Sequence, residues 1–425
     1  MKKYILFLLM SFLYTTRGMA QMAFNDLFCD STLRIDYIFE GNEEEQRIAV
    51  DKLNMMPRWY GKRQNLSEVP VEGNGQIIVR QHNSQNVVYR NSFSTLFQEW
   101  LSFENTTHER KAFENVFLVP MPKDTVDITV ILFDNRRQVK TEFTHVVSPN
   151  DILIRQIGFR HVTPYATLQQ AADTTRCIHI AYIAEGYTNE QMDDFLNDAR
   201  IANDALFAHE PFKSLKNRFN IIAVKSPSIE SGTSEPSNGI WRNTALDSHF
   251  DTFYSKRYLT TLHLKKLHDW MAGTPYEHII VLVNTDHYGG GGILNSYNLS
   301  MTKHDLYRPV VVHEFGHSFA GLGDEYAYEY EDIPMYPHDI EPWEHNLTTL
   351  VNFHGKWENL ISPKTKIPTP IGKDKNKVGV YEGAGYSMKG VYRALPDCRM
   401  RTNENPEFCI VCRKAITDLI NFYTE

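Results

Sequence analysis

Hydrophobic and polar positions alternate through the first third of the chain, between about residues 29 and 147. The stretches LRIDYIF, GQIIVRQ, NVVYR and DTVDITVILFD are rich in β-branched residues and are separated by Asn, Gly and Pro. Alternation of this kind is typical of half-buried strands. We therefore predict an antiparallel, β-sandwich-like domain over residues 21–150. No reactive side chains cluster in it, so we expect an accessory or binding module.

From residue 176 the pattern changes, because short apolar runs now alternate with amphipathic segments. A capping box at Thr188 and Gln191 predicts the start of one helix. The alternation indicates a mixed sheet with helices, an α+β or α/β architecture, over residues 176–425, after a linker at 151–175. The predicted strands are 177–184, 219–224, 278–283 and 293–300, and the predicted helices are 188–207, 259–271, one that begins near Pro309, and 409–423.

Two segments of this region are rich in Gly or Pro. The glycine run 289–292 lacks the Gly-Lys-Ser/Thr ending of a phosphate loop and does not open directly into a helix, so we interpret it as a mobile opening to a cleft. The strand before Pro309 is well placed to line that cleft and to pair with an extended substrate. Beyond Tyr326, frequent Pro and Gly predict a loop-rich lower half that forms the other wall of a groove.

Charge and the N-terminal segment indicate where the chain works. The net charge of −8 and the pI near 6.1 give no electrostatic footprint for nucleic acid or anionic lipid. Residues 1–20 have the charged start, apolar run and small-residue end of a signal peptide, which predicts a secreted, periplasmic or cell-surface protein. No second stretch is long enough to span a membrane. Cys29 leaves a lipid anchor open, but Phe28 precedes it where a small residue is expected.

The motif His313-Glu314-Phe315-Gly316-His317 carries the chemistry. Residues four apart lie on one face of a helix, so both imidazoles can bind one Zn²⁺ while the Glu314 carboxylate points at the water on that metal. Zinc lowers the pKa of this water to roughly 7, and Glu314 can then take its proton. Gly321 supplies a helix stop at a suitable distance. The motif predicts metal-assisted hydrolysis of a peptide bond.

A third protein ligand is needed, because catalytic zinc usually has three. The metzincin pattern HExxHxxGxxH/D places it six residues after the second histidine, where this chain has Gly323. Asp324 and Glu325 follow directly, and we favour Asp324 because it is closer to the metzincin spacing. A glutamate further downstream is the alternative, at Glu341 or Glu344, but the proline between them opposes a helix there.

The chain has five cysteines, an odd number that is low for its length. The pair Cys409 and Cys412 resembles half of a zinc knuckle or a redox pair, but no second CxxC occurs. We expect one disulfide from Cys398 to either Cys409 or Cys412, which would tie a loop to the last helix.

Several motifs, separated along the chain but found in a fixed order, together resemble those of a known family. They are IAEGYT at 183–188, SGTSEPSNGIWRNTALDSHF at 231–250, YGGGG at 288–292, HEFGHSFAGLGDEY at 313–326, VGVYEGAGY at 378–386, GVYRALPDCRMR and FCIVCRKAI. Over most of residues 177–425 the chain resembles the IgA peptidase family of zinc metallopeptidases, a metzincin-like group. Its first 150 residues resemble the β-rich N-terminal domain that some members carry.

The resemblance implies roles for particular residues. His313 and His317 would bind zinc with Asp324 as the third ligand, Glu314 would be the general base, and Met400 would lie in a Met-turn beneath the metal.

Three positions depart from the metzincin pattern. Ala320 and Gly323 occupy the usual glycine and third-ligand positions, and Thr402 stands where some metzincins place a tyrosine that steadies the oxyanion. Tyr392 is a nearby substitute for that tyrosine, although a packing role is the simpler interpretation.

We expect a secreted zinc endopeptidase with one catalytic Zn²⁺ and a protein or peptide substrate, for which a host glycoprotein such as an immunoglobulin is a candidate. Two other functions stay open. One is an envelope binding or adhesion protein that keeps a zinc site without cleaving anything, and the other is a zinc amidase that acts on a cell-wall or glycan-linked amide. The intact Glu314 argues against the first, and no feature of the sequence separates the second from a protease.

Overall fold

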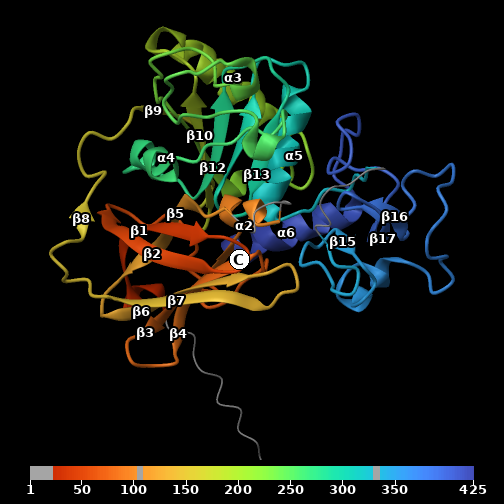
Figure 1. The fold of residues 1–425 in the computed structure, drawn as a ribbon, viewed down its shortest axis with the longest axis horizontal. Helices are drawn as coiled ribbons and strands as arrows, with labels where there is room; N and C mark the ends of the chain where they lie inside the picture. Colours follow the sequence, from red (N-terminus) through yellow and green to blue (C-terminus); the bar gives the residue numbers. More distant parts are fainter. Residues whose placement is uncertain (1–22, 103–108, 329–335) are drawn as a thin grey trace, which may run out of the picture.

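The computed structural model describes residues 23–102, 109–328 and 336–425. Figure 1 shows a β-rich N-terminal unit (red to orange), an α/β unit above it (green to cyan) and a C-terminal region (blue) beside them. This arrangement confirms the predicted α+β class with an N-terminal β-rich domain. The predicted signal peptide, residues 1–20, lies outside the described residues.

Two sheets form the N-terminal unit, in the strand orders β5-β1-β2-β8 and β4-β3-β6-β7. All their pairings are antiparallel except the short pair β2 and β8. Apolar residues of both sheets, such as Leu33 and Ile128, join one core, as in a β-sandwich. The elements are α1 (Phe24–Leu27), β1 (Phe28–Gly41), β2 (Gln46–Met56), β3 (Gly75–Gln81), β4 (Val87–Phe93), α2 (Leu96–Trp100), β5 (Lys111–Pro122), β6 (Val126–Phe133), β7 (Val139–Val147) and β8 (Arg155–Gln156).

A six-stranded sheet, in the order β13-β14-β12-β10-β11-β9, forms the centre of the α/β unit. Its four inner strands are parallel, and the edge strands β9 and β13 run antiparallel to their neighbours. Strand β10 is buried at every position, as expected for a strand covered on both faces. The bounds are β9 (Tyr165–Gln169), β10 (Ile178–Glu185), β11 (Phe219–Val224), β12 (His278–Val283), β13 (Gly290–Ile293) and β14 (Tyr297–Met301).

Different layers cover the two faces of this sheet. Ile180 and Tyr182 of β10 pack with α3, α5 and α6, whereas Ala181 and Ile183 join a core shared with α4 and the N-terminal unit. The helices are α3 (Met192–Leu206), α4 (Leu264–Met271), α5 (Tyr307–Ala320) and α6 (Ile410–Thr424). Short 3₁₀ turns are η1 (Asn189–Gln191), η2 (Lys216–Arg218), η3 (Pro236–Asn238), η4 (Thr252–Tyr254), η5 (Phe353–Gly355) and η6 (Glu358–Leu360).

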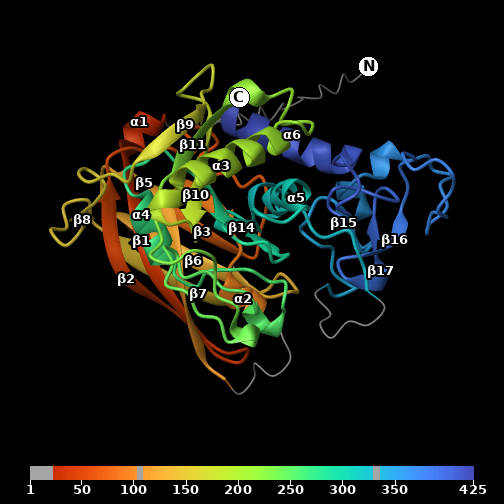
Figure 2. The same ribbon diagram turned by 90° about the horizontal axis from the view of Figure 1, so that it is seen from above.

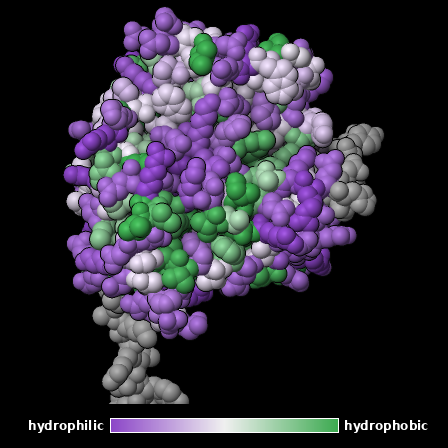
Figure 3. Space-filling view, turned by 60° about the vertical axis from the view of Figure 1, so that its left-hand side comes forward, coloured by the Kyte–Doolittle hydropathy of each residue, from purple (hydrophilic) through white to green (hydrophobic). Residues whose placement is uncertain are grey.

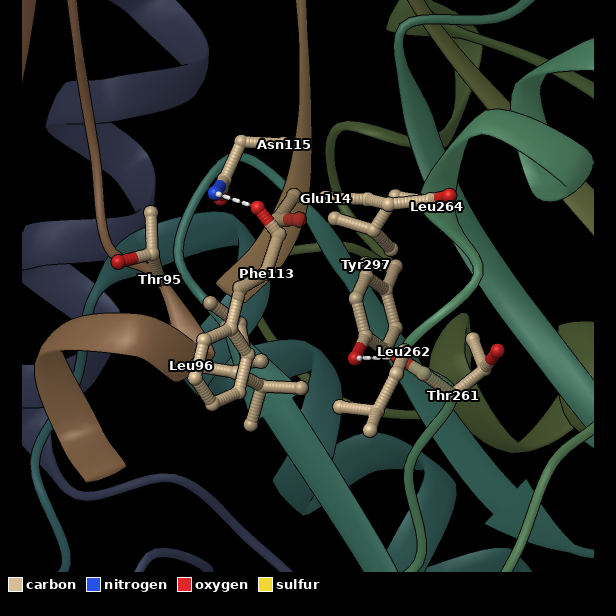
Figure 4. Close-up of a pocket in the computed structure, with 11 residues that line it drawn as sticks. Thr95, Leu96, Phe113, Glu114, Asn115, Thr261, Leu262, Leu264 and Tyr297 are labelled. Atoms are coloured by element: carbon tan, nitrogen blue, oxygen red, sulfur yellow. Dashed lines mark hydrogen bonds between the residues drawn. The ribbon is translucent and has the colours of Figure 1, made fainter. Parts of the chain in front are cut away.

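The N-terminal unit packs firmly on the α/β unit, since one hydrophobic core runs through both. Figure 4 shows a small pocket at this seam, lined by Phe113 of β5 on one side and Tyr297 of β14 on the other. The buried guanidinium of Arg34 in β1 crosses the seam and donates a 2.7 Å hydrogen bond to Asp269 of α4. The N-terminal unit is therefore part of the support of the central sheet.

The structure corrects the predicted strand at residues 293–300. The glycine run, interpreted above as a mobile opening, itself forms the edge strand β13, and a turn with Asn295 at φ 50° separates it from β14. The apolar pattern of Ile293 and Leu294 runs straight through this turn, and glycines carry no side chain that would signal a strand. The segment predicted as one strand therefore belongs to a hairpin of two strands, β13 and β14.

Two other segments differ from the sequence pattern. The helix predicted over residues 259–271 begins only at Leu264, because the preceding residues run extended and Thr260 bridges to His249. Within the predicted linker, 151–175, strand β9 joins the central sheet beside β11. The same segment exposes Ile152 and Leu153. Figure 3 turns that side of the molecule forward and shows hydrophobic residues gathered across its middle.

The C-terminal region carries a small sheet with the order β15-β17-β16, amid long loops. Its strands are β15 (Leu347–Thr348), β16 (Tyr381–Ala384) and β17 (Ser387–Arg393). Figure 2 shows α5 end-on, between the central sheet and this region. Within the described ranges, no helix combines the length and apolar character needed to cross a bilayer.

Candidate metal centre

Helix α5 carries His313 and His317 one turn apart, and the backbone fixes both rings. Nδ1 of His313 lies 3.0 Å from the carbonyl oxygen of Arg399, and Nδ1 of His317 lies 2.5 Å from that of Leu322. Since a carbonyl oxygen only accepts, each Nδ1 carries the proton and each Nε2 presents a lone pair. Both imidazoles are thus held in the tautomer that binds a metal through Nε2.

Asp324 reaches the same point because the chain turns back at the end of α5. The helix ends at Gly321, whose φ of 58° lies in the left-handed region that favours glycine. Asn346 then holds both backbone groups of Gly323, each through a 2.8 Å hydrogen bond. This fixes the loop so that Oδ1 of Asp324 lies 3.0 Å from Nε2 of His313 and 3.2 Å from Nε2 of His317.

The three ligand atoms fit a zinc ion. The two Nε2 atoms are 3.0 Å apart, and Oδ1 of Asp324 is buried without a hydrogen-bond donor. Three lone-pair atoms that face one another repel unless a cation lies between them. Around tetrahedral zinc with bonds of about 2.0–2.1 Å, ligand atoms lie roughly 3.3 Å apart, close to the spacing in this group. Of the three carboxylates considered besides Asp324, none enters this trio.

The charges of this cluster also favour a bound cation. Burial lowers the pKa of His317, but the Asp324 carboxylate outweighs it and raises that pKa to about 9. Burial raises the pKa of Asp324, yet the two histidines hold it well below its usual range. The cluster therefore keeps a carboxylate and attracts positive charge, which a proton supplies when no metal does.

Glu314 lies beside the trio and against the edge strand. A β-carbon built on Gly290 of β13 would come within 2.7 Å of Oε1 of Glu314, so only glycine leaves room for this carboxylate. Burial raises the pKa of Glu314, and the neighbouring histidines partly offset this. The outer edge of β13 is not fully free, because the Leu259 N–H approaches the Gly290 carbonyl oxygen at 3.4 Å.

Met400, which the resemblance places in a Met-turn beneath the metal, packs against Gly316 of α5. Its side chain is fully buried, and its carbonyl oxygen accepts a 2.8 Å hydrogen bond from the Glu325 N–H. Glu325 itself turns away from the histidines, toward Cys412 and Asn346. Of the two adjacent carboxylates that the sequence offered, the structure thus brings only Asp324 to His313 and His317.

Two tyrosines contact the centre, and the sequence analysis missed both. The Tyr386 hydroxyl donates a short hydrogen bond to Oδ2 of Asp324, and the Tyr326 ring stacks beside His313 at 6.4 Å between centroids. Tyr386 ends the GAGY part of a motif used for the resemblance, which was the available signal. Tyr392, the tyrosine considered above, instead interacts with Glu382.

The downstream glutamates also serve other contacts. Glu344 accepts a 3.1 Å hydrogen bond from the Tyr336 hydroxyl, and Glu341 accepts a 3.0 Å hydrogen bond from the Asn352 N–H. Both hold the loops of the C-terminal region.

The N-terminal unit contributes Glu99 near the metal centre. Its carboxylate accepts a 2.5 Å hydrogen bond from the Tyr258 hydroxyl, and burial raises its pKa to about 7. The charges of His317 and Asp324 also affect the pKa of Glu99, so this carboxylate lies close enough to interact electrostatically with the candidate metal ligands. The predicted accessory module therefore forms part of the surroundings of the site.

The expected disulfide is wrong for this structure. All five cysteines are free, and the sulfurs of Cys398 and Cys412 are 3.8 Å apart, far beyond the roughly 2.05 Å of a disulfide bond. Cys398, Cys409 and Cys412 are nevertheless clustered and buried.

Comparison with known families covers nearly the whole described chain. Residues 166–377 and 372–420 match the family described as IgA Peptidase M64, and residues 23–144 match Peptidase M64 N-terminus. No curated protein matched the chain.

Proposed function

Because the chain belongs to the IgA peptidase M64 family, and so is a peptidase with a protein substrate, we propose that it is an exported zinc-dependent endopeptidase. His313, His317 and Asp324 hold one Zn²⁺ in this proposal, and Glu314 is the general base. The observation that carries it is the convergence of three lone-pair atoms, 3.0–3.2 Å apart, beside that carboxylate.

The chemistry follows from these positions. A zinc ion in the trio supplies a Lewis acid that lowers the pKa of water and polarises a carbonyl group. The Glu314 carboxylate accepts a proton from the attacking water and then donates it to the leaving nitrogen. The C–N bond breaks, and a new carboxyl and a new amino group form. Tyr386 orients Asp324 through its hydrogen bond.

Export rests on residues 1–20, whose charged, apolar and small-residue parts follow the order of a signal peptide. Expression of the full chain in a bacterial host, followed by fractionation and N-terminal sequencing, tests this. A mature N-terminus at Gln21 outside the cytoplasm supports export, and an intact Met1 in the cytoplasm contradicts it.

Incubation with a mixed proteome tests the peptidase proposal. Zinc-loaded protein should create new peptide termini, and an immunoglobulin substrate can be included as one arm. Glu314→Gln should keep its zinc and lose about 10²–10⁴-fold in rate. Glu358→Gln, a surface glutamate paired with His354, is the matched control and should keep full activity.

Identical termini from the Glu314 variant and the parent protein would overturn the assignment. If the parent protein releases no peptide termini but cleaves a peptidoglycan amide, the zinc amidase is the correct function. A zinc-bearing protein that cleaves neither is the binding protein.

A further inference from the structure

A second cluster of ligand-type side chains lies behind the metal centre. Glu325, Cys398, Cys409 and Cys412 each present one ligand atom, and all four atoms lie within 4.8 Å of one another. None of the four residues is more than 3% exposed. Glu325 lies in the loop after α5, Cys398 in the turn before Met400, and Cys409 and Cys412 at the start of α6, so that Glu325 and Cys412 are more than 80 residues apart in the sequence.

The spacing of these atoms fits a tetrahedral ion. Zn–S bonds of about 2.3 Å place two sulfurs roughly 3.8 Å apart, and a zinc-bound sulfur and oxygen roughly 3.5 Å apart. The sulfurs of Cys398 and Cys412 are 3.8 Å apart, and Oε1 of Glu325 lies 3.3 Å from Cys412 Sγ and 4.0 Å from Cys409 Sγ. These three distances lie within about half an ångström of the values for a zinc ion, and the remaining pairs of ligand atoms lie within 4.8 Å of each other.

Backbone donors around the cluster favour thiolates over thiols. The Cys409 N–H lies 3.1 Å from Cys398 Sγ, and the Cys412 N–H lies 3.4 Å from Cys409 Sγ. Cys409 is also the N-cap of the 15-residue helix α6, where the helix dipole stabilises a negative charge. Hydrogen bonds from N–H groups to sulfur are what a metal-bound thiolate needs from its surroundings.

Glu325 supplies an independent indication of a ligand. Its side chain is completely buried, and Oε2 has no hydrogen-bond partner. Asn346 donates a 3.0 Å hydrogen bond to Oε1, which orients the carboxylate toward the sulfurs. A buried carboxylate with an unpartnered oxygen is unfavourable unless a cation compensates its charge.

A disulfide would not satisfy this arrangement. Any bridge joins two of the three thiols and leaves the third, together with Glu325, buried among apolar residues. A metal ion uses all four groups at once.

We propose that Glu325, Cys398, Cys409 and Cys412 bind a second, structural Zn²⁺. Soft thiolates in a closed tetrahedral site with no open position select zinc and make the site structural rather than catalytic. Binding releases the thiol protons and changes no oxidation state. The ion would tie together the loop that carries Asp324, the turn that carries Met400, and helix α6.

Metal content and cobalt spectra of the full-length protein test this proposal. The parent protein should hold about two zinc ions per chain, and Cys412→Ser about one. Asp324→Asn should also lose one, but from the other centre. Cobalt separates the two, because only thiolates give an intense near-ultraviolet charge-transfer band with Co²⁺. Asp324→Asn should keep this band and Cys412→Ser should lose most of it, whereas Cys177→Ser is the cysteine control and should keep both ions.

Measurements on the parent protein alone also test the proposal, in case Cys412→Ser does not fold. Titration with an organomercurial, which blocks thiolates, should release about one zinc ion and leave the other bound. One zinc ion, no cobalt–thiolate band and a mass two hydrogens below the reduced chain would establish a disulfide and overturn the proposal. A single zinc with all thiols free would overturn it as well. A parent protein that holds one zinc ion and shows an intact cobalt–thiolate band would support the structural site and count against the proposed peptidase site instead.

Discussion

The sulfur of Met400 lies directly against the helix position of Gly316. A β-carbon built on Gly316 would come within 2.6 Å of Met400 Sδ and within 3.4 Å of the Phe408 ring. The middle of the HEFGH motif thus rests on the buried methionine, and the close approach requires glycine there despite its cost of about 1 kcal/mol in a helix. The turn beneath α5 and the helix itself are fitted to each other at this point.

Gly316→Ala should therefore destabilise the protein. Alanine normally favours a helix by about 1 kcal/mol over glycine, but the overlap with Met400 should turn this into a net loss of about 1–3 kcal/mol. Denaturant unfolding measures it, and Gly372→Ala, where the added carbon meets nothing within 4 Å, is the control. The double variant Gly316→Ala/Met400→Ala should show coupling between the sites. Stabilisation by Gly316→Ala alone would contradict the packing described.

Gly290→Ala should impair catalysis without removing metal. The new methyl group would lie 2.7 Å from Oε1 of Glu314, so the carboxylate must shift from its position beside the trio. A misplaced general base typically costs on the order of 10–100-fold in kcat. Zinc content and the melting temperature serve as parallel readouts, and both should stay near those of the parent protein. An unchanged kcat would show that Glu314 tolerates the shift.

Tyr386→Phe should weaken metal binding. The hydroxyl donates to Oδ2 of Asp324, and partners of this kind typically contribute 10–100-fold in metal affinity. Competition with a chelator gives the affinity directly. The matched control is Tyr381→Phe, which removes a hydroxyl that donates a 3.0 Å hydrogen bond to the Lys377 carbonyl oxygen away from the centre. Equal affinities for both variants would remove Tyr386 from the support of Asp324.

His278 should make the protein sensitive to acid. Burial, with a smaller effect of His179, lowers the pKa of His278 from 6.5 to about 3. Between these values the unfolded chain binds the proton and the folded chain does not, so this contribution to stability is present above pH 6.5 and is lost as the pH falls.

From pH 6.5 to pH 4, the free energy of unfolding should therefore drop further in the parent protein than in His278→Gln, by on the order of 2–3 kcal/mol. Denaturant midpoints across this range measure the difference. His354→Gln, at a side chain that is 94% exposed, should follow the parent curve. Parallel curves for parent and His278→Gln would show that the imidazole is not buried in its neutral form.

Local spacing was enough for much of this protein. Alternation predicted the β-rich N-terminal domain, and the four-residue spacing of His313 and His317 predicted one helix face with Glu314 beside it. A helix or strand repeats with a fixed period, so residues near in sequence reveal which side chains share a face. The glycine run 289–292 could not be identified in this way, because glycines show no alternation of side chains and strand β13 is defined by its contacts with β14 and α5.

Which groups meet at the end of those elements was decided by tertiary structure. Asp324 and Glu325 are neighbours in sequence, yet one carboxylate joins the histidines and the other joins the cysteines. The partners that settle this, Asn346 and Cys412, lie more than 20 and more than 80 residues away. The sequence by itself predicted the fold class and placed His313, Glu314 and His317 together on one helix. Only tertiary packing decided which carboxylate lies beside the histidines, because a loop has no period of its own and takes its direction from distant contacts.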